Sequence, residues 1–168
     1  MATSPSKIFG IFGYPIGHSK SPAMHNAAYL ALGLPHIYLP FGVPPSRLKE
    51  AIAAMDVLGI RGVNVTRPHK EAVIPYLYRL TDAAQKIGAV NTIEIARGKR
   101  IGHNTDGFGF LKSLTEAKVD PSDARVILLG AGGAARGVAV ALLTAKISEL
   151  IIMARSDKRG QNLAAQLS

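Results

Sequence analysis

Short apolar runs alternate along the chain with segments whose apolar residues recur at helical spacing. The runs typical of strands are residues 7–12, 36–43, 62–66, 91–96, 100–103, 125–129 and 150–153. The segments typical of helices are residues 23–32, 47–58, 68–80 and 107–118, a stretch ending at 144, and residues 155–168. Strands that alternate with helices pair mainly in parallel, so the pattern predicts an α/β fold with a mostly parallel sheet in each part.

A polar, turn-forming stretch at residues 119–123 separates two strongly patterned regions. We therefore expect an N-terminal αβ domain over 1–109, followed by a connecting helix and linker over 110–122. The strand–turn–helix–strand pattern of 123–168 predicts the first part of a Rossmann nucleotide-binding domain, which the sequence leaves incomplete.

Composition and charge narrow the class of protein. The chain is 48% hydrophobic and 18% charged, which argues against disorder. The net charge of +9 is spread along the chain, aromatic residues make up only 6%, and Trp is absent, so we expect anionic small molecules as partners rather than nucleic acid. No apolar run approaches the ~20 residues that span a bilayer, and residues 1–7 lack a signal-peptide pattern, so we expect no membrane association and a cytoplasmic location.

A glycine-rich turn at residues 130–135 fits G-x-G-x-x-A between a strand and a helix. Gly130 allows the tight turn, Gly132 lets the backbone approach a pyrophosphate, and Ala135 allows close packing of helix on strand. The helix N-terminus then offers N–H groups to the anion. A turn without a ligand is the alternative, but the flanking pattern favours a dinucleotide site that includes Gly130, Ala131, Gly132, Gly133 and Ala134.

The end of the next strand indicates which dinucleotide binds. An NAD enzyme has an acidic residue there, ~20 residues after the turn, whereas this chain has Arg155 and Ser156, followed by Lys158 and Arg159. These side chains suit a 2′-phosphate, so we expect NADP. A solvated basic loop is the alternative, and Asp157 nearby would favour NAD.

Two polar loops in the first region hold candidate ligand-binding residues. Ser19 and Ser21 follow a strand, and Ser21 with the next proline is expected to cap the following helix; together the two hydroxyls suit a carboxylate. On the strand at 62–66, Asn64 and Thr66 face the same side. Lys70 follows in the first turn of a helix, where the dipole disfavours a cation, which favours a ligand-binding role over a solvated one.

The remaining polar residues give weaker indications of a function. Asp106 follows the last strand of the first region, where helix capping is its simplest role. His69 is expected to be a surface residue. The chain has no cysteine, and its 5 histidines form no metal-ligand pattern with acidic neighbours, so we expect no metal site.

Taken together, the loops resemble those of the shikimate dehydrogenase family. The motifs occur in order: residues 15–22 followed by His25-Asn26, Asn64-Val65-Thr66 leading to Pro68-His69-Lys70, residues 88–92, Asn104-Thr105-Asp106 and residues 130–134. The resemblance covers the whole chain. It implies an N-terminal substrate domain before the Rossmann part, a monomer or homodimer, and NADPH-dependent, reversible reduction of 3-dehydroshikimate to shikimate in aromatic amino acid and chorismate biosynthesis.

The resemblance also implies roles for individual residues. The shikimate site would be lined by Ser19, Ser21, Asn64, Thr66, Lys70, Asn91 and Asp106, with Lys70 and Asp106 as the catalytic pair. Asp82 would lie on the cofactor side. In the cofactor loop, Ala154 and Ser156 stand where the family usually has asparagine and threonine, and Arg67 stands where it usually has an apolar residue.

The family continues beyond the second strand of the nucleotide domain, whereas this sequence ends there. Two alternatives follow from the sequence. One is a quinate/shikimate dehydrogenase of broader specificity that uses NAD. The other is a non-catalytic shikimate-binding module whose nucleotide half no longer holds a cofactor.

Overall fold

The computed structural model describes residues 5–167; residues 1–4, part of the segment inspected for a signal peptide, lie outside it. The chain forms two compact units, Met1–Thr81 with Val90–His103, and Asp82–Ala89 with Asn104–Ser168. Segments 82–89 and 104–109 thus join the second unit, although the sequence pattern grouped them with the first. The assignment of a substrate domain and a cofactor domain to these parts stays a prediction.

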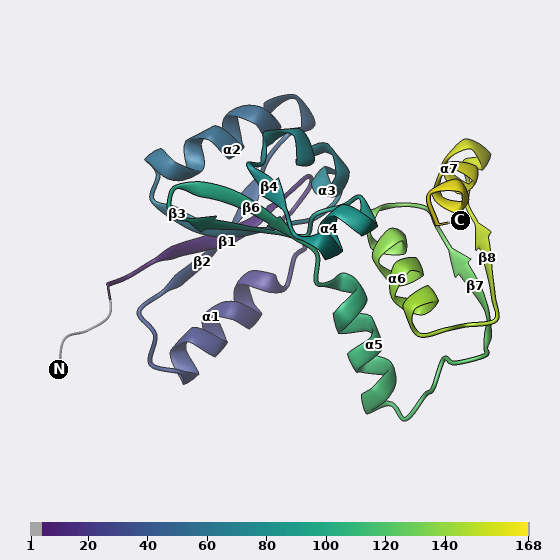
Figure 1. The fold of residues 1–168 in the computed structure, drawn as a ribbon. Helices are drawn as coiled ribbons and strands as arrows, with labels where there is room; N and C mark the ends of the chain where they lie inside the picture. Colours follow the sequence, from purple (N-terminus) through teal and green to yellow (C-terminus); the bar gives the residue numbers. More distant parts are fainter. Residues whose placement is uncertain (1–4, 168) are drawn as a thin grey trace. The chain divides into compact units, whose positions relative to one another are not determined.

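The first unit is built around a six-stranded sheet in the order β2-β1-β3-β5-β6-β4 (Figure 1). Its strands are β1 (Ile8–Gly13), β2 (Ile37–Gly42), β3 (Ile60–Val65), β4 (Arg79–Leu80), β5 (Thr92–Ala96) and β6 (Lys99–His103). The pairs β1–β2, β1–β3 and β4–β6 are parallel, while β3–β5 and the hairpin β5–β6 are antiparallel. The expected mostly parallel α/β sheet is confirmed.

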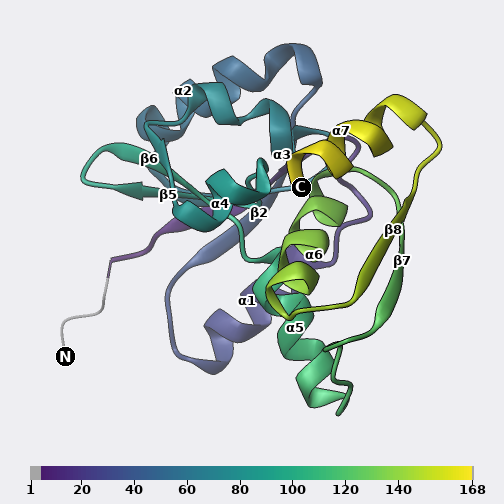
Figure 2. The ribbon, with the colours of Figure 1, turned by 45° about the vertical axis from the view of Figure 1, so that its right-hand side comes forward.

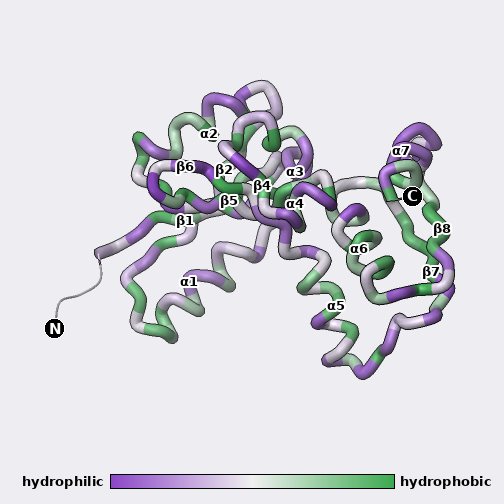
Figure 3. Tube along the Cα trace, viewed as in Figure 1, coloured by the Kyte–Doolittle hydropathy of each residue, from purple (hydrophilic) through white to green (hydrophobic). Residues whose placement is uncertain are grey.

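Helices α1 (Ser21–Ala31) and α2 (Leu48–Val57) lie on opposite faces of this sheet, and the 3-10 turn η1 (Pro45–Arg47) leads into α2 (Figures 1 and 2). The helical spacing within α2 places Leu48, Ile52 and Met55 in the core, where Met55 is 0% exposed. The apolar positions of α2 and of the central strands form the green stretches along the trace in Figure 3. Burial of this apolar stripe holds α2 against the sheet.

The prediction of a single helix over 68–80 is wrong. The chain there forms α3 (His69–Ala72), the 3-10 turn η2 (Ile74–Tyr76) and strand β4. Pro75 has no backbone N–H to give to a helix and clashes with the preceding turn, so the α-helix ends before it. The residues beyond then pair with β6, where Arg79 lies opposite Ile101 and Leu80 opposite Gly102.

The second unit contains α4 (Asp82–Ile87), α5 (Asp106–Glu116), β7 (Arg125–Leu129), α6 (Gly133–Thr144), β8 (Glu149–Met153) and α7 (Asp157–Leu167). Strands β7 and β8 are parallel and in register from Arg125 with Glu149 to Leu129 with Met153. Helices α5 and α6 pack so closely that a Cβ on Gly107 would lie 2.7 Å from the carbonyl oxygen of Gly137. The strand–glycine turn–helix–strand unit is thus the one that the sequence predicts.

Candidate active site

The loops after β1, β2 and β3 leave the same edge of the first sheet, at the carboxyl ends of three parallel strands. Their backbones are tied together: the Tyr14 N–H donates to the Arg67 carbonyl (3.1 Å), and the Thr66 N–H donates to the Phe12 carbonyl (2.9 Å). A Cβ on Gly13 would lie 2.5 Å from Cγ2 of Thr66, so this close approach requires glycine. Such an edge is the usual place for a ligand site in an α/β sheet.

Ser21 is not the N-cap of α1, contrary to the expectation from the sequence. Lys20 already has a helical backbone (φ −87°, ψ −7°), so Ser21 falls inside the first turn and Lys20 takes the cap position. The hydroxyl of Ser19 instead accepts a hydrogen bond from the Ser21 N–H (3.3 Å). This bond lies just before the helix rather than at its cap, and both serines are half-buried.

Lys70 is the second residue of the short helix α3 and is half-buried. Its carbonyl accepts a hydrogen bond from the Val90 N–H (2.7 Å), which joins α3 to the segment before β5. A helix of 4 residues has too few aligned peptides for the dipole argument made from the sequence. His69 is buried, 1% exposed, and its Nε2 lies 2.8 Å from the Val43 carbonyl, so the expectation of a surface histidine is wrong.

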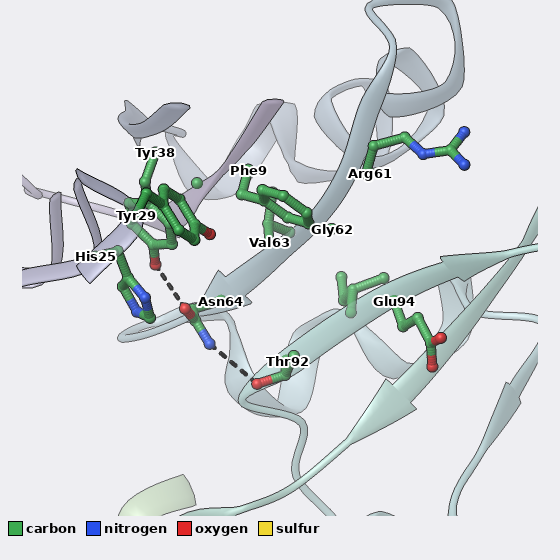
Figure 4. A pocket seen from close by; sticks show the side chains of 12 residues that line it. Phe9, His25, Tyr29, Tyr38, Arg61, Gly62, Val63, Asn64, Thr92 and Glu94 are labelled. Atoms are coloured by element: carbon green, nitrogen blue, oxygen red, sulfur yellow. Dashed lines mark hydrogen bonds between the residues drawn. The ribbon is translucent and has the colours of Figure 1, made fainter. Parts of the chain in front are cut away.

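A hydrogen-bond network connects the expected site residues Asn64 and Asn91. Asn64 Nδ2 donates to the hydroxyl of Thr92 (3.0 Å) and to the carbonyl of Asn91 (3.4 Å), while the Thr92 hydroxyl donates to Asn91 Oδ1 (3.0 Å). The hydroxyl of Tyr38 donates to Asn64 Oδ1 (2.6 Å), as Figure 4 shows. Sequence reasoning missed Tyr38 and Thr92. Thr92 belongs to the family motif at residues 88–92, which could have indicated a role in the site. Tyr38 lies in an ordinary strand pattern, which gives no such indication.

The network borders a cavity of about 310 Å³ within the first unit. Its lining combines aromatic and aliphatic side chains with Arg61 and Glu94 (Figure 4). Burial, with a smaller contribution from the nearby charge of ionised Tyr29, raises the pKa of Tyr38 well above its usual range. Burial also lowers the pKa of His25. Tyr38 is therefore a neutral hydroxyl, able to donate, at any physiological pH.

Most of the expected cofactor residues meet at a second cavity, of about 470 Å³, within the second unit. It is lined by Leu129, Gly130, Ala131, Gly132, Met153, Ala154, Arg155, Ser156 and Arg159. Gly130 has φ +118°, a conformation that side-chain-bearing residues rarely adopt, and its N–H donates to the Met153 carbonyl (2.7 Å). Both strand ends are thereby held beside the turn.

Other expected cofactor residues lie outside this lining. Gly133 and Ala134 are the first two residues of α6, so their N–H groups belong to its first turn. Lys158 and Asp157 are exposed residues at the start of α7. Asp82 is the first residue of α4, in the same unit as the glycine turn.

Asp106 is the first residue of α5 and is half-buried. The N-cap position of α5 is Thr105 rather than Asp106, and the Asp106 N–H donates to Oδ1 of Asn104 (3.0 Å). Asn104 is buried, and its Nδ2 donates to the Ala89 carbonyl (2.9 Å). Of the expected catalytic pair, Lys70 belongs to the first unit and Asp106 to the second.

Within residues 5–167, no group of three or more His, Cys, Asp or Glu side chains is arranged to hold a metal ion. Over the same described span, every helix is too short or too polar to cross a membrane.

A glycine turn with arginines beside it, between parallel strands, is the arrangement typical of nucleotide-binding α/β proteins. The family "Shikimate dehydrogenase substrate binding domain" matches residues 11–93, and "Shikimate / quinate 5-dehydrogenase" matches residues 113–168. The chain belongs to the shikimate dehydrogenase family.

Individual relatives agree with this membership. A shikimate dehydrogenase (NADP(+)) of Symbiobacterium thermophilum is 52% identical over 98% of this chain and 56% of its own length. The chain thus spans about half the length of such relatives. The shikimate dehydrogenase of Thermus thermophilus, solved with NADP(H) and shikimate, has a TM-score of 0.82 at 39% identity, covering 96% of this chain and 60% of that one.

The fold is also shared with an enzyme named for another substrate. The 5-ketofructose reductase of Gluconobacter sp. strain CHM43, solved without ligand, has a TM-score of 0.85 at 39% identity. The match covers 97% of this chain and 58% of that one.

Proposed function

We propose that this chain carries the substrate site and the pyrophosphate-binding turn of an NADP-dependent dehydrogenase that interconverts 3-dehydroshikimate and shikimate. The observation that carries the proposal is the set of half-buried polar residues at one strand edge of the first unit: Ser19, Ser21, Asn64, Thr66, Lys70 and Asn91. Hydroxyls, amides and one ammonium suit a polyhydroxylated carboxylate. The names of the relatives, shikimate dehydrogenase (NADP(+)), support this substrate and cofactor.

The charge of the second cavity suits NADP. The cavity is bordered by Arg155 and Arg159, while the nearest acidic residue in sequence, Asp157, is not part of the lining. Arg155 and Ser156 would hold the 2′-phosphate, and the turn from Gly130 to Ala134 with the start of α6 would hold the pyrophosphate. The bound cofactor supplies the hydride. Asp82 and Lys158 are proposed as further contacts on the cofactor side.

Lys70 and Asp106 are the proposed catalytic pair. When hydride reaches the carbonyl carbon, the oxygen gains negative charge and requires a proton, which the Lys70 ammonium donates; in the reverse direction Lys70 accepts it. General acid catalysis of this kind contributes roughly 10²–10⁴-fold to the rate. Asp106 is the proposed second residue of the pair, with a role in orienting a substrate hydroxyl.

Binding and turnover test the proposal separately. Calorimetric titration with shikimate, NADPH and NADH measures binding, and absorbance at the NADPH band measures oxidation of shikimate and of quinate. The proposal expects shikimate binding, a preference for NADPH over NADH and turnover of shikimate. Binding of shikimate without cofactor would favour the non-catalytic module instead, and equal use of quinate and NAD would favour the broader dehydrogenase.

Because a 5-ketofructose reductase shares this fold, 5-ketofructose is a useful third substrate for the assay. It is a polyhydroxylated ketone without a carboxylate. Reduction of 5-ketofructose in preference to 3-dehydroshikimate would contradict the proposal. The cytoplasmic location and the monomeric or homodimeric state stay predictions, and gel filtration tests the second.

A further inference from the structure

The His25-Asn26 pair of α1 holds one residue of the neighbouring edge strand. The Asn26 side chain accepts from the Tyr38 N–H (2.9 Å) and donates to the Tyr38 carbonyl (3.0 Å), as a further strand would. The His25 ring stacks on the Tyr38 ring with centroids 4.3 Å apart and planes at 17°. Tyr38 is 3% exposed. Both its backbone and its ring are therefore fixed by two consecutive residues.

From Tyr38 a relay of hydrogen bonds runs across three strands, through Asn64 and Thr92 to the Asn91 side chain. The hydroxyl of Tyr38 donates to the Asn64 carbonyl oxygen, the Asn64 amide donates to the Thr92 hydroxyl, and that hydroxyl donates to the Asn91 carbonyl oxygen. Figure 4 shows the first two links. In every link the donor is the group nearer Tyr38 and the acceptor is the group nearer Asn91. The three hydrogen bonds therefore all point the same way along the relay.

The direction of the relay is not arbitrary. If both asparagine amides were turned over, the same contacts could run the opposite way. In that arrangement Asn64 Oδ1 would face the backbone carbonyl of Asn91, where the structure has Asn64 Nδ2 at 3.4 Å. Two carbonyl oxygens repel each other, so the Asn91 backbone selects the observed direction, and the Tyr38 proton satisfies the Asn64 oxygen at its other end.

The relay determines what each asparagine can do toward a ligand. Both protons of Asn64 Nδ2 are engaged, by Thr92 and by the Asn91 carbonyl, so Asn64 can meet a ligand only through its oxygen, as an acceptor. Asn91 receives the Thr92 proton on its oxygen, so its Nδ2 is the donor end. An acceptor and a donor joined in this way are complementary to a hydroxyl group, which both donates and accepts.

We propose that Tyr38 is a positioning residue of the substrate site, which fixes Asn64 as an acceptor and Asn91 as a donor for a substrate hydroxyl. The identity of that substrate rests on the proposed function, whereas the relay does not. A substrate with a hydroxyl at this point is preferred over an analogue that lacks it, because only a hydroxyl can both donate to Asn64 and accept from Asn91.

Tyr38→Phe tests the relay because it removes the hydroxyl and keeps the ring that stacks on His25. In the ¹⁵N-labelled full chain without ligand, we expect the side-chain amide resonances of both Asn64 and Asn91 to move. We expect shikimate affinity, measured by calorimetry, to fall about tenfold, the usual effect of one unsatisfied buried acceptor. Tyr29→Phe is the matched control, because Tyr29 lines the same cavity but takes no part in the relay.

Variants of Thr92 separate the relay from general loss of packing. Thr92→Val keeps the shape and removes the donor to Asn91, so it should weaken shikimate binding as Tyr38→Phe does, and the double variant should be little worse than either single one. Thr92→Ser restores a hydroxyl and should restore affinity. In an active enzyme the loss should lie in KM more than in kcat, because Lys70 is unchanged.

Several outcomes overturn the proposal. Unchanged Asn91 resonances in Tyr38→Phe would show that no relay reaches Asn91, and changed resonances with unchanged affinity would show that the relay does not position the ligand. Additive losses in the double variant would show that the two hydroxyls act independently. If the wild-type chain binds no shikimate, the proposed function fails, while the resonances still decide whether the relay exists.

Discussion

The two units differ in the groups that form their candidate binding sites. In the first unit, the expected ligand-binding side chains are half-buried, and Asn64 among them is held by hydrogen bonds to Tyr38 and Thr92. In the second unit, the cavity is formed by the backbone of a glycine turn, with Arg155 and Arg159 beside it. Polar side chains tied into a network give a fixed pattern of donors and acceptors, whereas backbone N–H groups and flexible cationic side chains recognise charge. The contrast suits a chiral polyol in one unit and a phosphate-rich dinucleotide in the other.

The largest expected effect concerns Lys70, the proposed proton donor of the first unit. Lys70→Ala should lower turnover of shikimate by roughly 10²–10⁴-fold and leave shikimate binding largely intact, because Tyr38 and Thr92 still hold Asn64 in place. The assay is NADPH formation, with calorimetry for binding. Lys49→Ala, on the exposed side of α2, is the control and should retain wild-type rates. Turnover at the wild-type rate in Lys70→Ala would remove Lys70 from the mechanism.

The charge-based site of the second unit should depend on single cations. Arg155→Gln should weaken NADPH binding about 10- to 100-fold, because charge-assisted hydrogen bonds to a phosphate are among the strongest. NADH binding should change little, since NADH has no 2′-phosphate. Lys158→Gln, outside the cavity lining, should have a smaller effect. Equal losses for NADPH and NADH would assign Arg155 to the pyrophosphate instead.

The packing of the second unit can be tested with two glycines of one helix. Gly107→Ala should destabilise the unit by about 1–3 kcal/mol, because the new methyl group would lie 2.7 Å from the Gly137 carbonyl oxygen. Gly109→Ala, two residues along α5 with open space around it, should stabilise it by roughly 0.5–1 kcal/mol. Urea unfolding measures both. A Gly107→Ala protein as stable as wild type would contradict the close contact of α5 with α6.

The smallest expected effect is a pH dependence in the first unit. Burial lowers the pKa of His25, so the unfolded chain binds a proton more readily than the folded one. This contribution to stability is therefore present above the usual histidine pKa of about 6.5 and is lost as the pH falls below it. Urea unfolding at about pH 7.5 and about pH 5.5, on either side of that value, should show a smaller loss of stability in His25→Phe than in the wild type. Parallel losses in both proteins would exclude His25 as a contributor.

The two units also differ in how much of them the sequence predicts. The glycine turn is a local motif, so 130–135 and the basic residues after β8 could be assigned to one site by their order alone, and Gly130, Ala154, Arg155, Ser156 and Arg159 do line one cavity. The fold class follows from the alternation of strands and helices, which also located most elements.

The network of the first unit could not be predicted in this way. Tyr38, Asn64 and Thr92 come from three strands, and only the pairing of those strands brings them together. The errors at Ser21 and at residues 68–80 have a related origin. Which residue caps a helix depends on where the backbone first becomes helical, which the sequence does not show directly. Across residues 68–80 the apolar periodicity is weak, and Pro75 ends the α-helix despite it.

The position of β5 and β6 in the first sheet has a consequence for synthesis of the protein. These strands lie between β3 and β4, although the chain passes through α4 of the second unit before reaching them. A nascent chain that has emerged only to Thr81 therefore exposes the hydrogen-bonding groups of β3, on the side that β5 later covers. Such an open edge can pair with another chain, so a fragment ending at Thr81 should aggregate where one that extends past His103 does not.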